Sequence, residues 1–424
     1  MDLTKQFKEL VSQEDVADLL ELFSANPELR SRIDEPLFGF DSPAIVTAAG
    51  RGNREVIDTL LELGADINAR SAWWAGSFGV LDNDNHSLVP YLLERGAKVD
   101  VHAAARHGMF DKLRELVAAN PEGVRARGGD GQTPLHVACS VEIAAFLLDR
   151  GGEIDALDID HESTPAQYLI RSHPDIVRYL ISRGCRTDIL MASAVGDADL
   201  VRRHLEIDPE SIHMRVNKDY FPMKNPRAGG TIYLWTLGNG RSAHQVARSF
   251  GQAAILDLLF DHTPDDLKLL QACVTGRGSI VRAMMSRHPK HVRALAQASA
   301  HCISDAAEDN DTEAVRIMLE AGWPLEGDGK HTPLHWACWN GNNEMVEAIL
   351  QFHPPLDARD DDYHATPMGW AIHGSESSAR RKTGDYAATV LALLSAGAKP
   401  AEKIEGSEAV QNALRRWTTA SGRQ

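Results

Sequence analysis

The sequence lacks the cysteine pattern of a disulfide framework or of a structural zinc site. Its five cysteines are odd in number and widely spaced, and no two of them form a Cys-x-x-Cys pair. Three cysteines follow an alanine at positions where a small residue recurs, which favours core packing over reactivity: Cys139, Cys273 and Cys338. We therefore expect no metal site, and a protein that stays in a reducing compartment.

Long hydrophobic runs and an excess of basic residues are also absent. No stretch approaches about 18 uncharged apolar residues, and the segment Met1–Leu10 has no apolar signal core. Lysine and arginine total 44 against 60 aspartate and glutamate residues, which makes the formal net charge −16. This balance argues against binding to nucleic acid or to an anionic membrane. The prediction is a cytoplasmic protein without nucleic-acid or membrane partners.

The familiar catalytic and cofactor-binding motifs are missing as well. The sequence contains no GxGxxG after a strand, no GxxxxGK[ST], no HExxH and no GxSxG turn. The Gly238-Asn239-Gly240 triplet lacks a strand-to-helix context, so nucleotide binding is not expected. We expect no cofactor. The absence of a motif still leaves open an enzyme that is built on an unfamiliar site.

The sequence does contain a repeat. At 424 residues the chain exceeds the usual size of a single hydrophobic core, so it consists of several domains or of one modular array. Glycine closes a helix in the left-handed conformation and proline cannot continue one, so the stretches between such residues are predicted to be helices. Each stretch carries one apolar face: Gly52 to Gly64, Gly108 to Pro121, Gly196 to Pro209, Gly276 to Pro289 and Gly341 to Pro354.

A shorter helix precedes each of these helices, and it opens most clearly at Thr133–His136 and Thr332–His335, which both read Thr-Pro-Leu-His. Threonine caps the helix and proline occupies its first turn. Together with the Gly-Ala-Asp-Ile-Asn of Gly64–Asn68, these motifs make the sequence resemble the ankyrin repeat family. We count about twelve units of roughly 33 residues, several of them degenerate. The units at Thr164–Gln167 and Thr366–Gly369 lack the histidine.

The resemblance implies an all-α solenoid of helix-turn-helix repeats with short return-loop hairpins, in which the first helices line a concave groove. We assign residues 1–405 to the array and residues 406–424 to a C-terminal capping helix and tail. Two insertions interrupt the array, at about residues 216–240 and 375–385, and both are locally basic. Insertions of this kind often lie at the binding face of a solenoid.

In the ankyrin family, side chains just before the glycine between the two helices of a unit face the groove. The first half of the groove is then predicted to carry arginines, and its last third acidic, aromatic and histidine side chains. For general acid and base chemistry the candidates are Glu308, Asp309 and His373. For ligand binding the candidates are Trp235, Trp339, Asn340, Tyr233, Arg380, Lys382 and Tyr386.

Two functions remain open. The resemblance favours an interaction module that presents its groove to a partner protein or peptide. The alternative is an enzyme or small-molecule receptor, in which the insertions close an acid/base pocket around a molecule with an aromatic or apolar body. A cavity lined by Trp235, Trp339 and His373 would favour the alternative. His136 and His335 belong to the Thr-Pro-Leu-His motif, and we interpret them as structural hydrogen-bonding residues.

Overall fold

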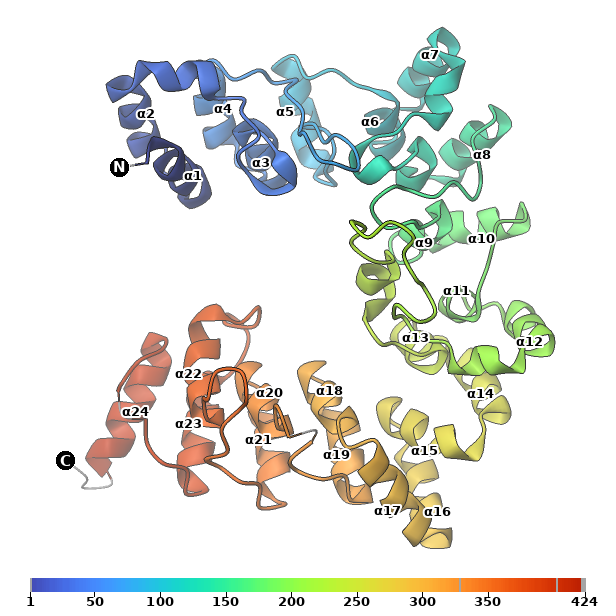
Figure 1. The fold of residues 1–424 in the computed structure, drawn as a ribbon, viewed down its shortest axis with the longest axis vertical. Coiled ribbons are helices and arrows are strands. Elements are labelled where there is room, and N and C mark those ends of the chain that lie inside the picture. Colours follow the sequence, from blue (N-terminus) through green and yellow to red (C-terminus); the bar gives the residue numbers. More distant parts are fainter. Residues whose placement is uncertain (1, 328, 402, 421–424) are drawn as a thin grey trace. The chain divides into compact units, whose positions relative to one another are not determined.

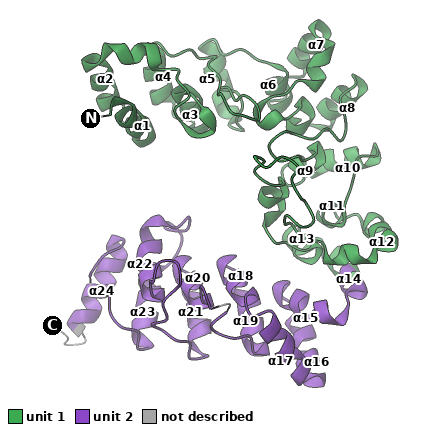
Figure 2. Ribbon diagram, viewed as in Figure 1, with its two compact units in different colours: residues 1–258 green, residues 259–424 purple. Residues whose placement is uncertain are grey.

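The computed structural model describes residues 2–327, 329–401 and 403–420 (Figure 1). These residues form helices and loops without a strand, and two isolated bridges pair Phe38 with Ser42 and Arg215 with Ser242. No helix in these residues is both long enough and apolar enough to cross a membrane. The chain divides into two compact units, Met1–Leu258 and Leu259–Gln424 (Figure 2). The all-α repeat architecture that the sequence predicts is confirmed.

Unit 1 is built from pairs of helices that contact each other in chain order. Its helices are α1 (Leu3–Gln13), α2 (Val16–Ala25), α3 (Ala44–Arg51), α4 (Arg54–Glu62), α5 (Val89–Glu94), α6 (Val101–Arg106), α7 (Phe110–Ala119), α8 (Val141–Asp149), α9 (Pro165–Leu169), α10 (Pro174–Ser182), α11 (Ile189–Val195), α12 (Ala198–Ile207) and α13 (Ala243–Ser249). Ahead of α8 the first helix of the pair is reduced to a short 3-10 helix, η6 (Pro134–Val137).

Unit 2 continues the same arrangement after α14 (Ala253–His262), which spans the boundary between the units. Its helices are α15 (Asp265–Val274), α16 (Gly278–Arg287), α17 (Pro289–Ala298), α18 (Cys302–Glu308), α19 (Thr312–Ala321), α20 (Pro333–Trp339), α21 (Asn343–Leu350), α22 (Pro367–Ser377), α23 (Tyr386–Ser395) and α24 (Glu408–Ala420). First helices α18, α20 and α22 contact each other in sequence, and so do second helices α19, α21 and α23. Because α22 continues to Ser377, the loop of the second insertion is shorter than the predicted residues 375–385.

The Thr-Pro-Leu-His motif determines how a first helix begins and how it contacts the next repeat. In α20, the Thr332 N–H donates to Nδ1 of His335 at 3.2 Å, and Nε2 of His335 lies 3.2 Å from the carbonyl oxygen of Ala365. His136 makes the equivalent contacts, with the Ser163 carbonyl oxygen 3.1 Å away. Both histidines are buried. Their interpretation as structural residues is therefore confirmed.

The apolar faces of the second helices form the core of each unit. In α21, Val346 and Ile349 are fully buried, whereas Leu350 in the last turn is only half-buried. A large cost of truncation to alanine is therefore expected at Ile349 rather than at Leu350. Of the three cysteines predicted to pack in the core, Cys273 and Cys338 are buried, whereas Cys139 is half-buried.

The C-terminal helix α24 packs on α23, with Val410 and Leu414 buried and Trp417 half-buried. Ending the chain before Ser407 is expected to expose the apolar face of α23. The thermal midpoint, followed by circular dichroism, should then fall by about 2–4 °C for each kcal/mol of lost burial. An unchanged midpoint would contradict a capping role for this helix.

Candidate functional site

A pocket of about 540 Å³ lies in unit 2, formed by α20, α22 and the loops that precede them. On α20, Trp336 and Trp339 are three residues apart, and Trp370 and His373 occupy the same two positions on α22. Because side chains three residues apart share a helix face, the four rings line one surface of two adjacent repeats. The residues that line the pocket are His331, Trp336, Trp339, Asp362, Tyr363, Ala365, Gly369, Trp370 and His373.

Trp370 is the centre of this aromatic cluster. Its ring centroid lies 5.0 Å from that of Trp336, with the two planes at 85°. The Trp339 ring is 5.9 Å away at 72°, and the Tyr363 ring is 6.3 Å away at 68°. Near-perpendicular contacts of this kind are a favoured geometry for aromatic pairs. They place the three other rings as walls around Trp370, which is itself 7% exposed.

A buried carboxylate holds Trp370 in place. The indole Nε1–H donates to Oδ2 of Asp360 at 2.9 Å, and the backbone N–H groups of Asp362, Tyr363 and Ala365 donate to the same carboxylate. Burial raises the pKa of Asp360, but these hydrogen bonds outweigh burial, so the pKa lies below its usual range. A negative charge therefore persists behind the Trp370 ring at neutral pH.

The rim of the pocket contains an acidic residue and two histidines. The side chain of Asp362 is 62% exposed, and its Oδ2 lies 3.0 Å from Nε2 of His331. His373 is exposed, and its ring centroid lies 5.6 Å from that of Trp339. Within the described part of the chain, no lysine or arginine lines this pocket.

Two of the predicted ligand-binding residues lie behind the pocket instead of facing it. Asn340 is buried, and its Nδ2 donates to the carbonyl oxygen of Ala307 at 3.1 Å, which ties α20 to α18. Tyr386 is buried, and its hydroxyl donates to the carbonyl oxygen of Trp339 at 2.9 Å. Gly374 allows this close packing, because a Cβ there would lie 2.7 Å from the same carbonyl oxygen. Both side chains position α20.

The predicted acid and base residues are not assembled in this pocket. His373 lines it, but Glu308 and Asp309 do not. Partial burial raises the pKa of Glu308, and Asp309 and Asp305 add to that effect. Arg380 and Lys382 of the second insertion are exposed and are not part of the pocket lining either.

The remaining two predicted residues, Tyr233 and Trp235, belong to the first insertion and to unit 1. Tyr233 is fully buried, and its hydroxyl donates to Oδ2 of Asp188 at 3.0 Å. Burial raises the pKa of Tyr233, and the Asp188 carboxylate adds to the effect. Trp235 is 59% exposed, and its ring centroid lies 4.8 Å from that of His161. Tyr233 thus anchors the insertion, whereas Trp235 is available at the surface of unit 1.

The first insertion folds back on the repeat that contains α9. The Val216 N–H donates to the Arg241 carbonyl oxygen at 3.0 Å, which closes the base of the loop. Further along, the Ile232 N–H donates to Oγ of Ser163 at 3.0 Å. A single π-helical turn, Leu234–Gly238, follows this contact.

The aspartate that holds Trp370 was not among the candidates from the sequence, although a spacing signal exists. Asp360 lies six residues before Thr366 and Trp370 four residues after it. Asp158 and Tyr168 have the same spacing around a Thr-Pro pair, and the Tyr168 hydroxyl donates to Oδ2 of Asp158 at 2.9 Å. An aspartate and an aromatic residue at these positions therefore indicate a buried hydrogen bond between a return loop and the helix that follows it.

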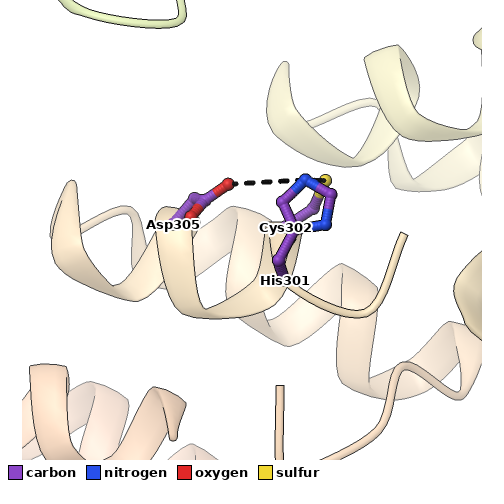
Figure 3. Close-up of side chains that lie close together, drawn as sticks. All are labelled: His301, Cys302 and Asp305. Carbon is purple, nitrogen blue, oxygen red and sulfur yellow. Dashed lines mark hydrogen bonds and ion pairs between the residues drawn. The ribbon is translucent and has the colours of Figure 1, made fainter. Parts of the chain in front are cut away.

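A separate polar cluster in unit 2 lies at the start of α18. Figure 3 shows His301, Cys302 and Asp305 on one helical turn. Nε2 of His301 lies 3.4 Å from Sγ of Cys302 and 4.0 Å from Oδ2 of Asp305. The side chains of His301 and Asp305 are 58% and 64% exposed. Three side chains from a single exposed turn do not enclose a site.

Comparison with known proteins agrees with the repeat architecture. The family described as "Ankyrin repeats (3 copies)" matches residues 101–191 and 303–404, which include the aromatic pocket. These two segments of the chain are therefore ankyrin repeats.

The chain aligns with only part of the length of each relative of known name. The chain is 24% identical to the E3 ubiquitin-protein ligase KEG of Arabidopsis thaliana over 353 residues, which are 70% of this chain and 21% of that protein. It is 27% identical to ankyrin repeat and SAM domain-containing protein 6 of Mus musculus over 136 residues, 30% of this chain and 15% of that protein. It is 30% identical to the Mus musculus palmitoyltransferase ZDHHC13 over 118 residues, 26% of this chain and 19% of that protein.

Among solved structures, the chain is similar to the human ASB11 ankyrin repeat domain. The sequence identity is 16% and the TM-score 0.31, over 72% of this chain and 100% of that chain. The chain spans about a fifth or less of the length of the three curated relatives. The activities in their names therefore belong to those proteins and are not assigned to this chain.

Proposed function

We propose that the chain is an interaction module whose aromatic pocket in unit 2 binds a cationic side chain of a partner protein, with a methylated lysine as the best fit. The observation that carries this proposal is the pocket lining of three tryptophans and Tyr363, with Asp362 at the rim. Aromatic faces attract cations, and methylated ammonium groups are typical ligands of such aromatic cages. The buried charge of Asp360 behind Trp370 adds to the negative potential.

The size of the pocket supports a side chain as its occupant. Its volume of about 540 Å³ falls in the range of small-ligand pockets, and a folded partner surface could not enter it. The apolar rings can contact the hydrocarbon stem of a lysine while the acidic rim faces its charge. The net charge of −16 also favours a basic partner segment in the encounter.

The arginines predicted along the first half of the groove already have intrachain partners. Nη1 of Arg51 donates to the Ser12 carbonyl oxygen at 3.0 Å. Arg106 pairs with Asp84 at 2.8 Å, and Nε of Arg171 donates to a backbone carbonyl oxygen in the first insertion at 2.6 Å. These contacts favour the pocket in unit 2 as the binding site.

The test uses the full chain and three fluorescent peptides that differ only in a central lysine, trimethyllysine or norleucine. We expect fluorescence polarisation to rank trimethyllysine above lysine and both above norleucine. Trp339→Ala should weaken binding of the trimethyllysine peptide about fivefold or more, because an aromatic anchor is lost. Trp235→Ala, which removes an exposed tryptophan of unit 1, is the matched control and should leave binding unchanged.

A charge variant separates cation binding from apolar binding. Asp362→Asn should weaken binding of the trimethyllysine peptide and leave the weak norleucine binding as it is. Equal affinity for trimethyllysine and norleucine, or full binding by Trp339→Ala, would contradict the proposal. Tetramethylammonium that binds the free pocket as tightly as the peptide would favour the alternative, a small-molecule receptor.

A further inference from the structure

We infer that unit 1 contains a binding site for a divalent transition-metal ion, formed by Asp130, Asp160 and His161 beneath the first insertion. One ligand atom from each of the three side chains lies within 4.8 Å of the other two. An imidazole nitrogen with two carboxylate oxygens suits Zn²⁺ or Mn²⁺, whereas Ca²⁺ and Mg²⁺ prefer oxygen ligands alone.

The three side chains come from the return loops of two adjacent repeats. Asp130 lies in the tight turn Gly129–Gly131 ahead of η6, and Asp160 and His161 lie in the corresponding loop ahead of α9. The backbone N–H of Asp160 donates to the carbonyl oxygen of Asp130 at 3.1 Å, which ties the two loops together. The ligand set is therefore held by backbone contacts as well as by side chains.

The imidazole of His161 is oriented as metal-binding histidines are. Nδ1 lies 2.8 Å from the carbonyl oxygen of Gly230 in the insertion, so Nδ1 carries the proton and Nε2 presents its lone pair. Nε2 lies 3.6 Å from Oδ2 of Asp160, which is longer than a hydrogen bond. Two ligands of one tetrahedral ion, with bonds of about 2.0–2.2 Å, stand about 3.4 Å apart. The observed spacing is close to that value.

Each carboxylate is also oriented through one oxygen. Oδ1 of Asp130 accepts from the indole Nε1–H of Trp73 at 3.1 Å, and Oδ1 of Asp160 accepts from the Gly229 N–H at 3.2 Å. Hydrogen bonds of this kind orient the first ligands of a metal ion. In the part of the chain that the structure describes, the second oxygen of each carboxylate accepts no hydrogen bond and could bind an ion.

Two of the three side chains in the cluster are buried, and Asp130 is half-buried. The side chains of Asp160 and His161 are 7% and 11% exposed. In residues 2–327, 329–401 and 403–420, no lysine or arginine forms an ion pair with Asp130 or Asp160. Burial of carboxylates without a counter-charge is unfavourable, and a divalent cation would remove that cost. This separates the cluster from the exposed one at His301, Cys302 and Asp305.

The test is a calorimetric titration of the metal-stripped full chain with ZnCl₂. The wild type should bind zinc at this site, and Asp160→Asn and His161→Gln should each lower the affinity about tenfold or more. Both variants keep a side chain that can make the outer hydrogen bond, and circular dichroism in EDTA checks that they fold. His301→Gln, the matched control at the exposed cluster, should retain the affinity.

A measurement on the wild type does not depend on the variants folding. Co²⁺ in place of zinc should give ligand-field absorption bands without a thiolate charge-transfer band, since the proposed site contains no cysteine. Absence of metal binding, wild-type affinity in Asp160→Asn and His161→Gln, loss of affinity in His301→Gln, or a thiolate band would each overturn the inference.

Discussion

Replacement of Trp370 by alanine is expected to lower the free energy of unfolding by about 3–5 kcal/mol, the range for loss of a large aromatic residue from a core. Trp370 is 7% exposed and contacts Trp336, Trp339 and Tyr363. The substitution also removes the indole donor of Asp360, whose buried carboxylate would lose one hydrogen bond. Urea unfolding followed by circular dichroism measures the change.

Two further variants test whether the loss in the free energy of unfolding is specific to position 370 and is not caused by removal of any tryptophan. Trp370→Phe keeps an aromatic ring and loses the indole N–H, so it should cost less than the alanine variant. Trp235→Ala removes a tryptophan that is 59% exposed and should change the free energy of unfolding by about 0.5 kcal/mol or less. A Trp370→Ala variant as stable as Trp235→Ala would show that the aromatic cluster does not hold α20 and α22 together.

Acidification from pH 7 to pH 4 is expected to destabilise the protein through His136. Burial lowers the pKa of this imidazole to about 3, and the nearby Arg127 and His102 act in the same direction. In the unfolded chain the pKa is about 6.5. Between these pH values the unfolded chain binds a proton at His136 that the folded chain does not. The neutral imidazole therefore makes its full contribution to the free energy of unfolding above about pH 6.5, and this contribution is lost as the pH falls toward about 3. The full contribution is roughly 5 kcal/mol.

His136→Gln isolates this contribution. In the next repeat Gln167 occupies the same position, and its Oε1 accepts from the Thr164 N–H at 2.8 Å, so glutamine can keep the cap of the helix. The variant should lose less stability than the wild type between pH 7 and pH 4 in urea unfolding at each pH. Buried carboxylates with a raised pKa, such as Asp188, act in the opposite direction in both proteins and cancel. Parallel pH profiles for the two proteins would contradict the prediction.

The repeat architecture was readable from the sequence because its signals act over a few residues. The Thr-Pro-Leu-His of α20 gave the start of a helix, its capping and the contact with the next repeat, all of which the structure contains. The repeat period also places Trp339 and His373 at equivalent positions on adjacent first helices. Their common lining of one pocket follows from that period, because first helices of neighbouring repeats lie side by side.

Which polar and aromatic side chains face outward was decided by the tertiary structure. Tyr233, Asn340 and Tyr386 are residue types that often bind ligands. Each of them is nevertheless buried against the backbone or the side chain of another repeat. The sequence could not indicate this, because the partners lie 33 to 47 residues away.

The sequence alone determined the repeat and most of its helices, since periodicity, capping and the conformations of glycine and proline are local properties. Only the tertiary structure brought Asp130 to Asp160 and His161, and set Asp360 behind Trp370. Contacts of this kind join loops of different repeats, and the first insertion adds one more segment to the cluster. The geometry of these contacts depends on how each loop folds over the neighbouring loop. The spacing of residues along the chain does not specify this folding.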